Sequence, residues 1–62
     1  MRYVWFNGID GREVAVNPQN VLWVREAHNA AGNTYIAFGK DTGLTVKESP
    51  RSVTGLIESA MQ

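Results

Sequence analysis

The chain has 62 residues, with six basic and six acidic side chains and no cysteine. A domain of this size buries only about 60% of the surface that its unfolded chain exposes, so disulfides, metals or partner subunits usually support it. The lack of cysteine excludes a disulfide framework, and one histidine cannot build a structural zinc site alone, which leaves partner subunits as the expected support.

The charge balance and the apolar runs also narrow the class of protein. The net charge of the chain is zero. Nucleic-acid-binding domains usually carry a strong excess of basic residues, and membrane-surface proteins often carry a polybasic patch, so the charge favours neither class. Apolar runs such as Tyr3 to Phe6 are far too short to span a membrane, and the N-terminus lacks the apolar core of a signal peptide. We therefore expect a cytoplasmic protein in which residues 1–62 form a single domain.

A hairpin is predicted at the start of the chain. Its first strand is Arg2 to Phe6, which is rich in aromatic and β-branched residues. The segment Asn7 to Gly11 contains an Asn-Gly and an Asp-Gly pair, and both pairs are strong hairpin signals. The returning strand is Arg12 to Val16, with Val14 and Val16 on one face.

Three more strands are predicted after a break at Asn17 to Asn20. Pro18 cannot donate a hydrogen bond to a ladder, so we expect a turn or a single helical turn there. A loop at His28 to Asn33 and a polar turn at Gly39 to Gly43 separate the strands that follow. These strands are Val21 to Ala27, Thr34 to Phe38 and Leu44 to Glu48.

The end of the chain predicts an α-helix. Ser49 is a good N-cap, and Pro50 stands where a first-turn proline is tolerated. One apolar stripe follows at helical spacing, and it should cover one face of the sheet. Its members are Val53, Leu56, Ile57, Ala60 and Met61. The predicted fold class is α+β: a small antiparallel β-meander of about five strands with one C-terminal α-helix.

Several strands are apolar on both faces, which one covering helix does not explain. In the first strand, Tyr3 and Trp5 lie on one face, and Val4 and Phe6 lie on the other. Strand parity predicts that the uncovered face shows some of Tyr3, Trp5, Ala15, Trp23, Arg25, Tyr35 and Ala37. An exposed aromatic row usually marks a contact surface. We interpret it as the surface that binds other copies of the chain and a protein partner, through Tyr3, Trp5, Trp23, Arg25 and Tyr35. The alternative is a sheet that curls into a small barrel and buries both faces itself.

No motif predicts catalysis. His28 lies in a predicted loop, and no second histidine or any cysteine completes a ligand set. The segment Phe38 to Gly43 echoes a phosphate loop, but Thr34 stands where the upstream glycine is required and Asp41 replaces the Ser or Thr. No two carboxylates have a reason to pair. We therefore predict a protein that is not an enzyme, with no catalytic residue, no metal and no cofactor.

Two alternatives to a protein-binding module remain open. The first is binding of single-stranded nucleic acid, in which aromatic side chains stack on bases and arginines supply charge. The residues concerned are Trp5, Trp23, Tyr35, Arg2, Arg12 and Arg25. The neutral net charge and the interleaved glutamates disfavour this alternative, because backbone binding would be weak. The second is binding of a small ligand such as a nucleotide in a pocket formed between subunits.

A series of short motifs resembles a known family. The motifs, in order, are Asn7-Gly8, Val16-Asn17-Pro18, Val24-Arg25-Glu26, Thr34 and Val46-Lys47-Glu48-Ser49. Together they resemble the small flagellar and swarming-motility proteins of the FlbD/SwrD type, and similar short uncharacterised phage and bacterial proteins. This chain differs in having extra residues at Ile9 to Gly11 and His28 to Asn33, and in carrying two tryptophans. The resemblance implies a non-enzymatic accessory or regulatory role without catalytic residues. A phage origin would fit a small factor that binds and alters a host protein.

Overall fold

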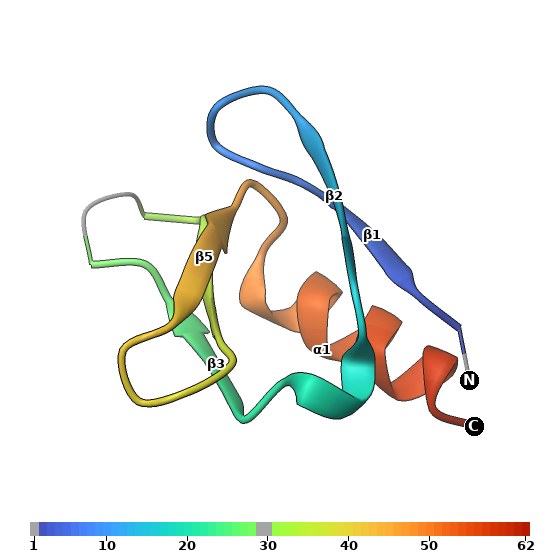
Figure 1. Cartoon of the computed structure of the whole chain (residues 1–62). Helices are drawn as coiled ribbons and strands as arrows, with labels where there is room; N and C mark the ends of the chain where they lie inside the picture. The colour runs from blue at the N-terminus through green and yellow to red at the C-terminus, as the bar shows by residue number, and fades with distance from the viewer. Residues whose placement is uncertain (1, 29–30) are drawn as a thin grey trace.

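The computed structural model describes residues 2–28 and 31–62, and Figure 1 shows their arrangement. The strands are β1 (Val4–Asn7), β2 (Glu13–Val16), β3 (Trp23–Glu26), β4 (Thr34–Ala37) and β5 (Gly43–Val46). A 3₁₀ turn, η1 (Pro18–Asn20), connects β2 to β3, and the helix α1 (Pro50–Ala60) follows β5. The predicted α+β class, with antiparallel strands and a C-terminal helix, is confirmed.

The five strands form two sheets rather than one continuous meander. The first is the antiparallel hairpin β1-β2, and the second is the antiparallel sheet β3-β4-β5. The separation occurs at η1, where the Asn17 Oδ1 accepts a hydrogen bond from the Gln19 N–H at 3.0 Å and the following Pro18 is buried. The single helical turn expected here is confirmed, and it carries the chain away from β2 before β3 begins.

The turn of the hairpin uses only one of the two predicted signals. Asn7 belongs to β1, so the Asn-Gly pair does not form the turn. The Asp-Gly pair does: Gly11 has a φ of +89°, and the Asp10 Oδ1 accepts from the Arg12 N–H at 3.0 Å. The Gly8 N–H donates to the Arg12 carbonyl at 2.8 Å. A loop that ends in a left-handed glycine is typical of a three-residue hairpin connection.

The two sheets join at one corner. Gly8 forms an isolated antiparallel bridge with Val46 at the end of β5, and the Lys47 N–H donates to the Asn7 carbonyl at 2.7 Å. Both sheets direct their inner faces toward one core. Its buried members are Val4, Phe6, Val16, Ile36, Val46, Val53, Ile57 and Ala60. The outer faces of the two sheets therefore point away from a shared centre.

The helix begins as predicted, but its buried stripe is narrower. The Ser49 Oγ accepts from the Ser52 N–H at 3.2 Å, which confirms the N-cap. The buried residues of α1 are Val53, Ile57 and Ala60. Leu56 and Met61, which were predicted to complete the stripe, are 44% and 57% exposed. At helical spacing they lie on the two flanks of the buried stripe. Among the described residues, no helix is both long and apolar enough to cross a bilayer.

Candidate interaction surface

An aromatic cluster lies on the outer face of the three-stranded sheet. The register pairs Arg25 with Tyr35 and Trp23 with Ala37, so these side chains share one face, opposite the buried Ile36. The ring centroids of Trp23 and Tyr35 are 5.7 Å apart, and the rings are tilted by 44°. The Arg25 Cζ lies 5.5 Å from the Trp23 centroid and 4.9 Å from the Tyr35 centroid. This arrangement, called here the Trp23 cluster, holds a cation against two aromatic rings.

Gly43 makes room for the Tyr35 ring. A Cβ atom on Gly43 would overlap the hydroxyl end of Tyr35 and would lie 2.6 Å from the Ile36 carbonyl oxygen. Ala37 lies between Trp23 and Gly43 in the register and is only 1% exposed. The register thus places Ala37 on the predicted outer face, but the residue is buried there, directly opposite Trp23. Trp23 itself remains 46% exposed.

A second apolar surface lies on the hairpin. Tyr3 and Trp5 are 63% and 61% exposed, while Val4 between them is buried. Ala15 on β2 is paired with Trp5 and is half-buried. A shallow hollow of about 250 Å³ runs from Tyr3 and Trp5 to Leu56 on α1. We call Tyr3, Trp5 and Leu56 the Trp5 surface.

The five candidate residues thus lie on two surfaces, not on one. Sequence parity placed Tyr3 and Trp5 on the same outward face as the Trp23 cluster. Parity holds within each sheet, but β2 and β3 are not paired, so the hairpin and the larger sheet present separate outer faces. The two tryptophans consequently point away from a common core on different sheets.

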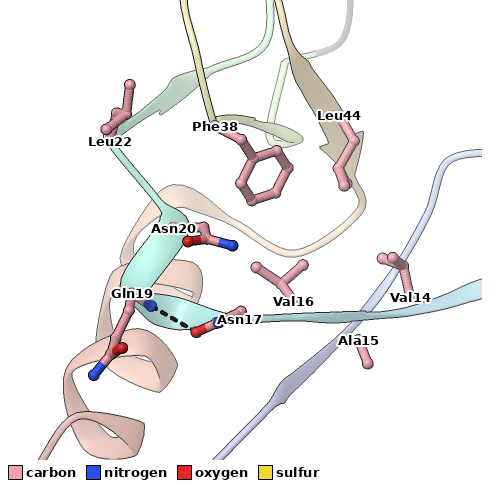
Figure 2. Close-up of a pocket in the computed structure, with 9 residues that line it drawn as sticks. All are labelled: Val14, Ala15, Val16, Asn17, Gln19, Asn20, Leu22, Phe38 and Leu44. Atoms are coloured by element: carbon pink, nitrogen blue, oxygen red, sulfur yellow. Dashed lines mark hydrogen bonds between the residues drawn. The ribbon is translucent and has the colours of Figure 1, made fainter.

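A groove that sequence reasoning missed lies between the two sheets. Its volume is about 450 Å³, and Figure 2 shows Val14 and Val16 of β2 pointing toward Phe38 and Leu44 across it. The amides of η1 and of Asn17 line its end. A second hollow of about 430 Å³ follows from Val14 and Leu44 toward the hairpin turn. The groove exists because β2 does not pair with β3, and no single segment of sequence signals that.

Several polar residues of the short sequence motifs form hydrogen bonds between elements of the fold. The Asn7 N–H donates to both carboxylate oxygens of Glu48 at 3.1 Å, and the Asn7 Nδ2 donates to the Glu48 Oε2 at 2.8 Å. The Thr34 Oγ1 donates to the Glu48 carbonyl at 2.6 Å. The Glu26 Oε2 accepts from the Gly32 N–H at 3.1 Å. These side chains therefore act as structural links between the hairpin, the sheet and the start of α1.

The described residues contain no group of three or more His, Cys, Asp or Glu side chains that could hold a metal ion. His28 is exposed, and the loop that follows it includes residues 29–30, which lie outside the described part of the chain. What the surface offers instead is exposed aromatic area, one clustered guanidinium and an apolar groove.

Comparison with protein-family models, with curated proteins and with solved structures finds no match to this chain.

Proposed function

We propose that this protein is a small non-enzymatic interaction module of regulatory type, which self-associates through its β-sheet and binds a protein partner. The observation that carries the proposal is the exposure of Trp5 and Trp23, at 61% and 46%, on the outer faces of two different sheets. Exposed apolar patches on small domains usually mark contact surfaces. Tryptophan, tyrosine and arginine, the members of the Trp23 cluster, are also enriched among the residues that dominate binding energy at interfaces.

The exposed aromatics are not the result of a loosely packed chain. The accessible area is 4310 Å², and a folded monomer of 6.9 kDa is expected to expose about 4,000 Å². Phe6, Ile36 and Val46 are buried to 1% exposure or less. The exposed area is therefore close to that of a compact chain of this mass, although both tryptophans lie at the surface.

Two separate surfaces suit two kinds of contact. The hairpin side carries Trp5 and an open strand edge, which suits pairing with a second copy. The Trp23 cluster then stays free for the partner. Its guanidinium is already held against two rings, so little side-chain entropy is lost when it binds. Such a cluster fits a protein surface that presents a carboxylate beside an apolar side chain.

Self-association is tested by light scattering on a sizing column over a dilution series. We expect a mass of about 14 kDa or more, at least twice the 6.9 kDa of one chain. Trp5→Ala should lower this mass, whereas Trp23→Ala alters the partner surface and should leave the mass unchanged. Ile9→Ala is a further control, since Ile9 is 58% exposed but lies in the hairpin turn. A wild type that is monomeric at every concentration, or a Trp5→Ala variant with unchanged mass, would refute self-association through the hairpin side.

Binding of single-stranded nucleic acid is a second candidate, favoured by one observation. The Arg25 guanidinium lies within 5.5 Å of two ring centroids, and such cationic aromatic faces can stack on bases. Titration of tryptophan fluorescence with oligonucleotides should then show binding that weakens as salt rises. The absence of binding at low salt would eliminate this candidate and leave the first proposal intact.

A further inference from the structure

The two sheets have four outer strand edges, on β1, β2, β3 and β5. The edges of β1 and β5 meet at the corner where Gly8 bridges Val46, and the Asn7 carbonyl there already accepts from the Lys47 N–H. The edges of β2 and β3 take no part in this corner. An unpaired edge presents a row of N–H and C=O groups that can accept another strand unless the protein blocks it. Which edge is open therefore decides where a second chain can pair.

The edge of β3 is covered at Glu26. The Ala27 N–H donates to the Asn33 carbonyl at 3.0 Å, and alternation along the strand then directs the backbone groups of Glu26 to the free edge. The Arg25 Nη1 donates to the Glu26 carbonyl at 3.2 Å, so a guanidinium already occupies this edge. A strand pairing with β3 would have to displace it and disturb the Trp23 cluster.

Among the described hydrogen bonds, the edge of β2 is covered only at its end, where the Asn17 carbonyl accepts from the Asn20 N–H at 3.0 Å. The Gly8 N–H donates to the Arg12 carbonyl, so alternation directs Val14 and Val16 toward β1. Glu13, Ala15 and Asn17 then direct their backbone groups outward. The apolar groove of about 450 Å³ opens beside this same strand (Figure 2).

We propose that β2 is the self-pairing edge, and that two copies join β2 to β2 antiparallel about a two-fold axis at Ala15. The inference rests on the proposed self-association and specifies its surface. In this register Ala15 faces Ala15 of the second copy, Glu13 faces Asn17 and Val14 faces Val16. The product is a four-stranded sheet with the two copies of β1 at its outer edges.

Charge favours this register over one centred on Glu13. A two-fold axis at Glu13 would place two carboxylates directly opposite each other, which is destabilising. With the axis at Ala15, the two glutamates lie four residues apart, about 14 Å along the strands, which exceeds the Debye length of about 10 Å at 0.1 M salt. The Asn17 Oδ1 already accepts from the Gln19 N–H, so its amide NH₂ can donate to the facing Glu13 carboxylate.

Apolar contacts complete the interface on both faces of the new sheet. On the inner face, Val14 and Val16 of the second copy extend the wall of the groove over Phe38 and Leu44. On the outer face, the small Ala15 leaves space above the axis for the Trp5 ring of each copy. A stable interface needs about 800 Å² from each partner, nearly a fifth of the 4310 Å² exposed here, so these contacts are required in addition to the strand edge.

A charge-swap experiment at the axis tests the register. Ala15→Lys and Ala15→Glu each place like charges opposite each other, and each should weaken the dimer about tenfold or more. An equimolar mixture of the two variants should restore it. Thr54→Lys, at an exposed position on α1, is the control and should leave the dimer unchanged. A wild-type dimer that both Ala15 variants leave intact would overturn the β2 edge but not self-association itself, whereas a monomeric wild type would overturn both.

A disulfide cross-link provides a second test, in which the folding of the variant is checked separately from its pairing. Cα atoms of a hydrogen-bonded antiparallel pair lie about 5.5 Å apart, within the range of a disulfide. Because the chain has no cysteine, Ala15→Cys should give a single disulfide-linked dimer under mild oxidation, and Thr54→Cys should not. Circular dichroism of the reduced variant verifies that it is folded. A folded Ala15→Cys protein that cross-links no faster than the Thr54→Cys control would overturn the proposal.

Discussion

Thr34 is the side chain whose replacement most directly tests the links between the elements. It is 0% exposed, and its Oγ1 donates to the Glu48 carbonyl at 2.6 Å. Glu48 in turn accepts from the Asn7 N–H and Nδ2, so this hydroxyl supports the point where the hairpin meets the sheet and the helix begins. Thr34→Val keeps the shape of the side chain and removes only the donor.

The expected cost follows from the loss of one part-buried hydrogen bond. Such a bond contributes about 1 kcal/mol to the stability of a protein. For a domain of this size, 1 kcal/mol corresponds to roughly 4–8 °C in melting temperature. Thr34→Val should therefore lower the melting temperature by at least about 4 °C.

Thr54→Val is the matched control. The Thr54 Oγ1 also donates to a backbone carbonyl, that of Arg51 at 3.1 Å, but the residue is exposed on α1. Water can replace this bond, so the change should stay within about 0.5 kcal/mol. Urea unfolding followed by circular dichroism, at one fixed protein concentration because self-association shifts apparent stability, measures both variants. Equal stability of Thr34→Val and Thr54→Val would refute the reasoning.

Three further substitutions probe the cluster and the helix in the same urea titration. Gly43→Ala places a Cβ 2.6 Å from the Ile36 carbonyl oxygen and against the Tyr35 ring, so it should cost about 1–3 kcal/mol and change the near-ultraviolet signal of the aromatic cluster. An unaltered spectrum would show that the ring does not depend on that space. Ser49→Ala removes the N-cap of α1 and should cost about 1 kcal/mol; a neutral result would mean that the cap does not hold the helix start. Gly55→Ala should stabilise the protein by about 0.5–1 kcal/mol, because a Cβ there meets no atom within 4 Å and the backbone is helical; destabilisation would contradict that open environment.

The two tryptophans lie on different surfaces, so one surface can pair with a second copy while the other stays accessible. Trp5 lies beside the open edge of β2, through its pairing with Ala15, while Trp23 lies on the sheet whose free edge Arg25 covers. Pairing at β2 would therefore leave the Trp23 cluster accessible in both copies. A dimer of this kind would present two identical partner-binding faces, which raises avidity for a repeated or dimeric partner.

Features that depend on a few neighbouring residues could be predicted from the sequence. A serine followed by proline predicted the N-cap and first turn of α1, and Asp10-Gly11 predicted the hairpin turn. Alternation predicted that Trp23 and Arg25 share a face, and the sheet register places them so. Each of these features depends on a few neighbouring residues, through steric preference, a cap or the two-residue period of a strand.

Only the tertiary structure determined how the two sheets and the helix are arranged relative to one another. The 3₁₀ turn at Pro18 separates β2 from β3, so Trp5 and Trp23 lie on different surfaces and a groove opens between the sheets. The burial of Ala37, which is paired with Trp23, and the exposure of Leu56 on α1 likewise depend on packing between elements. Strand parity orders side chains within one sheet, but it carries no information about two sheets that share a core without sharing a ladder.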